Sequence, residues 1–142
     1  MMTTLRMGLL VVFAGLALLL AMPIAHATAV GSQNPQLTVR ASTASDGVDP
    51  DRATVGDTVT VASSVRNNTA RARSVTITYT LEDPTGRSQT YSETVRIGAR
   101  KTFSRSFSYL VDPSYPKGVY DLTVSAKNSR GTSSATATLE IY

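Results

Sequence analysis

The chain contains no cysteine and no tryptophan, and aromatic residues make up only 6% of its 142 residues. Without thiols there is no disulfide, no cysteine-based zinc site and no thiol nucleophile, so the fold must be held by packing alone. The single histidine, His26, lies in a segment that we expect to be removed, which leaves no imidazole for metal binding or general-base catalysis. The sequence therefore predicts a protein that is not an enzyme and that has no cofactor, apart from the calcium site considered below.

The N-terminus carries the one long apolar run of the sequence. Met7 to Met22 are all apolar or glycine, and Arg6 is the only charge before them. The small-x-small pattern at residues 25–27 then favours cleavage before Thr28, so residues 1–27 are predicted to be a helical secretory signal peptide. A retained membrane anchor is the alternative, although the run is shorter than the about 20 residues that span a bilayer comfortably. We expect a secreted or cell-surface protein, extracellular or periplasmic, that touches the membrane only through an uncleaved signal.

After a flexible linker over residues 28–35, apolar side chains recur at every second position as far as the C-terminus, which is the period of a half-buried strand. Turn signals rich in proline and glycine separate the alternating segments. The sequence therefore predicts, for residues 36–142, an all-β, immunoglobulin-like β-sandwich of about seven antiparallel strands. A closed barrel is the structural alternative. The expected strands begin near Leu37, Thr58, Val75, Ser88, Thr102, Tyr120 and Ala135.

Three of these segments allow more detailed expectations. The strand from Val75 has the cleanest alternation and should be central in its sheet. The strand from Ser88 to Ile97 has Glu93 on its apolar face, which is typical of a partly exposed edge strand. The strand from Thr102 offers Phe107 as its best core residue.

Three stretches between Val55 and Ile141 carry a family resemblance: VGDTVTV leading to Val65-Arg66-Asn67, SVTITYTLEDPTG from Ser74, and PKGVYDLTV from Pro116. They resemble the bacterial and archaeal immunoglobulin-like modules called CARDB (cell-adhesion-related) domains and, more loosely, fibronectin type III domains. The resemblance implies a sandwich without a disulfide and a role in cell-surface adhesion. Family members are usually repeated modules of large surface proteins, whereas this sequence has one copy.

Tyr120 also has a physical interpretation. It stands two residues before Leu122, where a sandwich often sets a tyrosine whose hydroxyl binds back to the preceding loop.

Basic residues concentrate in the middle of the chain, where they outnumber acidic ones. Arg71, Arg73, Arg100 and Lys101 are candidate contacts for an anionic polymer or for the acidic turn of a neighbouring copy. An ordinary solvated face is the alternative. Tyr115, between two prolines on a predicted crossover loop, is a further candidate binding residue. No continuous basic tract exists, so we expect no nucleic-acid partner.

Two further candidate sites are weaker patterns. Asp46, Asp49 and Asp51 lie in an oxygen-rich loop that could hold calcium, although the spacing departs from an EF-hand and an acidic surface turn is the alternative. Asn67 begins an Asn-x-Thr glycosylation sequon at a predicted strand end, and a plain polar turn is the alternative.

Two functional hypotheses follow. The first is a secreted, non-catalytic binding or adhesion module whose partner is a cell-surface protein or an anionic envelope polymer. The second is the structural subunit of an extracellular filament, in which residues 28–45 self-associate by pairing with an edge of the next copy.

Overall fold

The fold is that of a computed structural model, which describes residues 28–30 and 33–142. The predicted signal peptide lies outside these residues. The described part consists of β-strands joined by loops and includes no helix long and apolar enough to cross a membrane. The strands are β1 (Thr28–Val30), β2 (Leu37–Ser45), β3 (Arg52–Ala53), β4 (Thr58–Asn67), β5 (Arg73–Glu82), β6 (Ser88–Ile97), β7 (Thr102–Leu110), β8 (Gly118–Asn128) and β9 (Gly131–Ile141).

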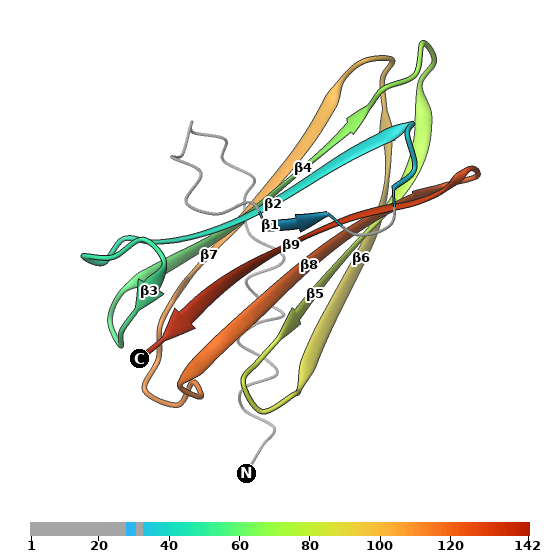
Figure 1. The fold of residues 1–142 in the computed structure, drawn as a ribbon. Coiled ribbons are helices and arrows are strands. Elements are labelled where there is room, and N and C mark those ends of the chain that lie inside the picture. Colours follow the sequence, from blue (N-terminus) through green and yellow to red (C-terminus); the bar gives the residue numbers. More distant parts are fainter. Residues whose placement is uncertain (1–27, 31–32) are drawn as a thin grey trace.

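The strands form two facing sheets (Figure 1). One sheet has the order β1-β9-β8-β5-β6, and the short β3 runs parallel to the end of β9. The other sheet has the order β2-β4-β7, and every pairing except that of β3 is antiparallel. The all-β sandwich with seven long strands is confirmed, and the closed barrel is wrong because the two sheets do not join into one.

The core lies between the sheets and is built from alternate residues of the long strands. In β4 every second side chain is buried, and Val59, Ile77 and Val124 are 0% exposed. Because strand side chains alternate between faces, the polar positions of the same strands point to solvent. Phe107 is buried as expected, β5 is internal to its sheet, and β6 with Glu93 is an edge strand.

Tyr120 binds the crossover loop as predicted. Its hydroxyl donates a hydrogen bond to the Pro116 carbonyl at 2.7 Å, and its ring belongs to the core. Burial raises the pKa of this phenol to about 12. The contact ties the loop after β7 to the start of β8.

The two short strands β1 and β3 were not predicted. β1 pairs with Ala135 and Thr136 of β9, and β3 pairs with Glu140 and Ile141 of the same strand. Segments of three and two residues are too short to show a period of two, which is why the sequence pattern misses them. β1 falls in the region expected to be a linker, and the two short strands pair with the middle and the C-terminal end of β9.

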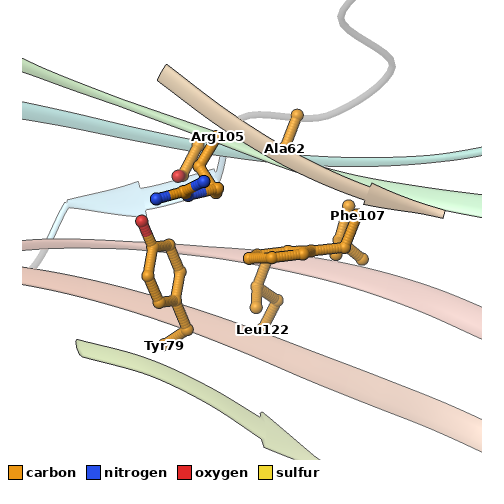
Figure 2. A pocket seen from close by; sticks show the side chains of 7 residues that line it. Ala62, Tyr79, Arg105, Phe107 and Leu122 are labelled. Atoms are coloured by element: carbon orange, nitrogen blue, oxygen red, sulfur yellow. The ribbon is translucent and has the colours of Figure 1, made fainter. Parts of the chain in front are cut away.

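The two long sides of the sandwich are closed differently. On the side of β2 and β9, the Thr43 hydroxyl donates to the Thr138 carbonyl at 2.6 Å. On the side of the edge strands β6 and β7, the closure is an ion pair between Glu93 and Arg105, which Tyr79 supports from the core. Figure 2 shows the Tyr79 hydroxyl turned toward the Arg105 guanidinium, above Phe107 and Leu122.

Candidate functional site: a basic surface at one end of the sandwich

The antiparallel registers place the β4–β5, β6–β7 and β8–β9 connections at the same end of the sandwich (Figure 1). This end gathers cationic side chains from segments that are far apart in the sequence. No Asp or Glu occurs in residues 58–81, 94–111 or 122–139, which contain these connections and the adjoining parts of the strands. We call this surface the basic end; its eight cations are Arg66, Arg71, Arg73, Arg96, Arg100, Lys101, Lys127 and Arg130.

The four predicted cationic contacts are therefore brought together, in the β4–β5 and β6–β7 connections or directly beside them. The sequence argument missed the contribution of Lys127 and Arg130, which lie at the β8–β9 turn. Their signal in the sequence was the turn Asn128-Ser129-Arg130-Gly131, but only the register of β8 with its neighbours shows which end the turn occupies.

Asn67 joins the two loops that carry the predicted contacts. Its side chain is fully buried, and its amide nitrogen lies 2.8 Å from the carbonyl oxygen of Arg71, 3.0 Å from that of Ile97 and 3.1 Å from that of Gly98. Its amide oxygen accepts hydrogen bonds from the backbone and hydroxyl of Thr69. The residue thus fixes the β4–β5 loop against the β6–β7 turn.

This geometry corrects the expectation of a glycan on Asn67. A glycan would be attached to the amide nitrogen, which is enclosed and already used by three carbonyls. The folded domain has no room for it, and the residue has a structural role instead.

Arg100 is held in an unusual backbone conformation. Its φ is 61°, in the left-handed region that non-glycine residues rarely adopt. The backbone nitrogen of Arg100 donates to the Thr69 carbonyl at 3.2 Å, and its guanidinium donates to the Asn68 carbonyl at 2.7 Å. The turn is therefore held in place by the loop beside it, which fixes the direction of its cations.

Arg73 differs from the other seven cations because it is only partly exposed. Its Nε atom is buried and has no hydrogen-bond acceptor, the one such side-chain atom among the described residues. Buried polar groups normally have partners, so this atom marks a place where an acceptor is missing.

A second polar network ties the start of the domain to the same end. The Asn34 side chain donates to Asn128 at 2.8 Å, and Asn128 in turn donates to Gln36 at 3.0 Å. Asn128 also accepts from the backbone nitrogen of Arg130. Asn34 is 4% exposed although the sequence placed it in a flexible linker, because the pattern of alternation cannot show a tertiary hydrogen bond.

The opposite end of the sandwich is acidic. It carries the β2–β4 and β5–β6 loops, the β7–β8 crossover and the end of β9 (Figure 1). We call it the acidic end; its nine carboxylates are Asp46, Asp49, Asp51, Asp57, Glu82, Asp83, Asp112, Asp121 and Glu140, against the cations Arg52, Arg87 and Lys117. The Ser114 hydroxyl and backbone hold the pKa of Asp112 below its usual value, so that carboxylate stays ionised.

The candidate calcium ligands do not assemble into a site. Among the described residues, no group of three or more His, Cys, Asp or Glu side chains could hold a metal ion. Asp46 accepts from the backbone nitrogen of Thr58 at 2.6 Å, and Asp49 accepts from that of Asp51 at 3.0 Å. These carboxylates stabilise the loop between β2 and β4.

Tyr115, the remaining predicted contact, lies at the acidic end and away from the predicted cations. Its ring is partly buried against the core, with its centroid 6.3 Å from that of Tyr109. Burial raises the pKa of its phenol. The ring is therefore engaged in packing, and it does not form one surface with the arginines.

A polar cluster of Tyr79, Glu93 and Arg105 joins the two sheets on the side of β6 and β7. The Glu93 carboxylate accepts from Arg105 Nε at 3.0 Å and from the Tyr79 hydroxyl at 3.0 Å, and a second guanidinium nitrogen also contacts it. The hydrogen bond to Glu93 raises the pKa of Arg105, and burial raises that of Tyr79. Arg105 therefore keeps its positive charge, and the Tyr79 hydroxyl keeps its proton.

Comparison with known proteins supports the fold. No protein-family model matches the sequence, and no curated protein matches it either. A CARDB domain from Pyrococcus furiosus, solved in complex with di-metal ions, matches with a TM-score of 0.52 and 12% identity over 79% of this chain and 94% of that one. The C-terminal domain of Wzt matches with a TM-score of 0.53 and 15% identity over 83% and 79% of the two chains.

Larger proteins contain a similar domain. An alkylpurine DNA glycosylase from Pseudomonas fluorescens, bound to DNA, matches with a TM-score of 0.55 and 10% identity over 78% of this chain. The chain spans only 31% of that glycosylase and 16% of a Listeria innocua β-glucosidase. At these identities the matches establish a small immunoglobulin-like β-sandwich, the fold of CARDB domains among others.

Proposed function

We propose that the protein is a secreted, non-catalytic binding module whose basic end engages an anionic polymer of the cell envelope. The observation that carries this proposal is the gathering of eight cations at one end, in three connections and the strand ends beside them, with no carboxylate among them. Loops set on a rigid sandwich are the usual place for binding residues. Here the loops are fixed by Asn67 and Asn128, so the cations are presented in a set arrangement.

The composition of the basic end favours a polymer of repeated negative charge. Seven of its eight cations are exposed, and both ion pairs of the described residues, Arg52–Glu140 and Arg105–Glu93, lie elsewhere. The large exposed apolar side chains of the described residues also lie elsewhere, so the contacts that this surface can make are mainly those of charged groups. Binding through such a surface is mainly electrostatic and weakens with salt.

Arg73 adds a specific contact to this general attraction. Its Nε atom lacks an acceptor, and an arginine guanidinium binds carboxylate or phosphate oxygens with paired hydrogen bonds. A phosphate or carboxylate group of the polymer would pair with the part of the Arg73 guanidinium that is exposed.

Export is part of the proposal and rests on the N-terminal sequence. The apolar run of Met7 to Met22 and the small residues at 25–27 support it, and the absence of cysteine places no demand on the redox state of the compartment. Secretion is tested by the N-terminal sequence of the protein recovered outside the cytoplasm, which should begin at Thr28.

Strand donation does not enter the proposal. β2 pairs with β4 of its own sandwich over all nine residues, and Leu37, Val39 and Ala41 are buried in its own core. Donating β2 would require these contacts to be broken, and no observation in the structure favours that exchange.

Binding can be tested with two soluble polyanions, polyphosphate and poly-glutamate, against matched charge reversals. The test variant is Arg71→Glu with Lys101→Glu at the basic end, and the control is Arg87→Glu with Lys117→Glu at the acidic end. All four side chains are exposed and both variants change the net charge equally. We expect the test variant to bind at least about tenfold more weakly and the control to change affinity by less than about threefold. Equal losses in both would show that net charge alone matters, and wild-type protein that binds neither polymer at low salt would refute the proposal.

A further inference from the structure

The two ends of the sandwich are complementary to each other. The basic end has eight cations and no carboxylate, whereas the acidic end has nine carboxylates and three cations. Of those three, Arg52 is already paired with Glu140 at 3.0 Å. The long strands run from one end of the sandwich to the other (Figure 1). The residues of opposite charge therefore lie at opposite ends of the molecule.

An independent observation marks the acidic end as a contact surface. The large hydrophobic side chains that are exposed in the described residues all lie there: Val48, Val55, Leu110, Val119 and Tyr142. Val48 and Val55 are in the β2–β4 connection, Leu110 ends β7, and Val119 is the second residue of β8. Each of the five lies within two residues of an Asp or Glu in the sequence, so apolar and acidic side chains are mixed over this end, as on surfaces that bind other macromolecules.

We propose that copies of this protein associate head to tail, the basic end of one copy docking on the acidic end of the next. Charge complementarity selects a second copy as the occupant, because the same chain carries a surface of matching sign at its other end. The long stems of arginine and lysine can cover the apolar side chains of the acidic end while their heads meet its carboxylates.

A contact within one copy illustrates how such docking works. The guanidinium of Arg52 lies over the Tyr142 ring, with its carbon 4.0 Å from the ring centroid, and also bonds Glu140. An apolar ring and a carboxylate at the acidic end thus hold one guanidinium together. The arginines of a neighbouring basic end would use the remaining carboxylates and apolar side chains in the same way.

The symmetry of this contact determines the assembly. A head-to-tail interface uses two different surfaces of each copy, so it continues into an open linear array unless the rotation happens to close a ring. No strand leaves its own sandwich in this arrangement, which distinguishes it from strand donation. Since the interface consists mainly of exposed charges, it should be reversible and sensitive to salt.

If the basic end binds a polyanion as proposed above, the polymer and a second copy of the protein share one binding surface. A polyanion and the acidic end of another copy would occupy the same basic end, so they should compete. The association itself does not depend on that function and is tested without any polymer.

The test is sedimentation velocity of the protein expressed from its full coding sequence and purified as the host processes it. At about 10 mM salt, where charges act over about 30 Å, the weight-average sedimentation coefficient should rise with protein concentration. At about 1 M salt, where the range is about 3 Å, it should stay at the monomer value. A monomer at every concentration in low salt would overturn the proposal.

Two variants identify the surfaces. Glu82→Lys with Asp121→Lys alters the acidic end, where these residues face each other across β5 and β8. Arg71→Glu with Lys101→Glu alters the basic end. Each variant alone should associate at least about tenfold more weakly than wild type. Thermal unfolding and circular dichroism like those of wild type establish that each variant is folded.

Mixing the two variants gives the decisive result. The acidic-end variant keeps a native basic end, and the basic-end variant keeps a native acidic end, so an equal mixture should recover association with about the wild-type affinity. A mixture that stays monomeric, or variants that associate like wild type, would contradict head-to-tail docking. Polyanion binding, measured at dilutions where wild type is monomeric, tests the proposed function separately.

Discussion

Replacing Asn67 with alanine should destabilise the domain and disorder the basic end together. The substitution leaves the Ile97 carbonyl buried without its donor, which costs about 1–3 kcal/mol. The carbonyls of Arg71 and Gly98 are partly buried, and each should add about 0.5–1 kcal/mol. We therefore expect a loss of about 2–5 kcal/mol, a large share of the about 5–15 kcal/mol by which domains are stable.

The assay is urea unfolding followed by circular dichroism, combined with polyphosphate binding of the folded protein. Asn68→Ala is the matched control, because that amide makes only exposed hydrogen bonds, to Pro35 and Thr38. It should cost under about 1 kcal/mol.

Asn67→Asp sharpens the test. It preserves size and the acceptor for Thr69 but turns a carboxylate oxygen toward three carbonyls. We expect it to be at least as destabilising as alanine. An Asn67→Ala protein within about 1 kcal/mol of wild type, with an unchanged slope against urea, would refute the idea that this residue holds the two loops together.

Further predictions concern the Glu93–Arg105 ion pair, the hydrogen bond of Tyr120 and the loop between β2 and β4. Arg105→Ala should lower the free energy of unfolding in urea by about 2–3 kcal/mol, because it leaves the partly buried Glu93 carboxylate without its cation. The double variant with Glu93→Ala should lose less stability than the sum of the two single losses. Additive losses would contradict a coupling between the two side chains. Because burial raises the pKa of Tyr120 to about 12, the folded state retains this proton longer than the unfolded state, whose pKa is about 10. The stabilisation is complete below about pH 10 and is lost as the pH rises through about 12, so Tyr120→Phe should flatten that part of the pH profile of unfolding; a profile as steep as that of wild type would count against it. Added calcium should leave the melting temperature unchanged, since Asp46 and Asp49 bind backbone nitrogens, and a calcium-dependent rise in differential scanning calorimetry would restore the metal hypothesis.

The strands and their faces could be predicted because they depend on local pattern. Alternation places Val75, Ile77 and Tyr79 inward, and all three are buried in the structure. The position of Glu93 on an apolar face identified the edge strand for a physical reason, since a carboxylate needs solvent or a partner and found both beside Arg105.

The functional surface was only partly predictable because it depends on which connections share an end. Arg71 and Arg100 were candidates from local charge, whereas Arg130 lies some sixty residues beyond Arg71 in the sequence and joins them only through the registers of β5, β8 and β9. The contact of the Asn67 amide nitrogen, as donor, with three carbonyl oxygens likewise has no local signature. A glycosylation sequon and a buried structural asparagine can have the same sequence. The two prolines beside Tyr115 make it a candidate contact in the sequence, but its ring packs on Tyr109.

The separation of charge along the strands also gives the molecule a preferred orientation. Strands of ten or eleven residues at about 3.3 Å per residue set the two poles about 30 Å apart, which amounts to a large electric dipole moment. Near a negatively charged wall, the torque on that dipole would stand each molecule upright before contact, with its cations inward. A first layer adsorbed in this way would present the carboxylates of the acidic end outward, so the covered wall would again have a negatively charged surface.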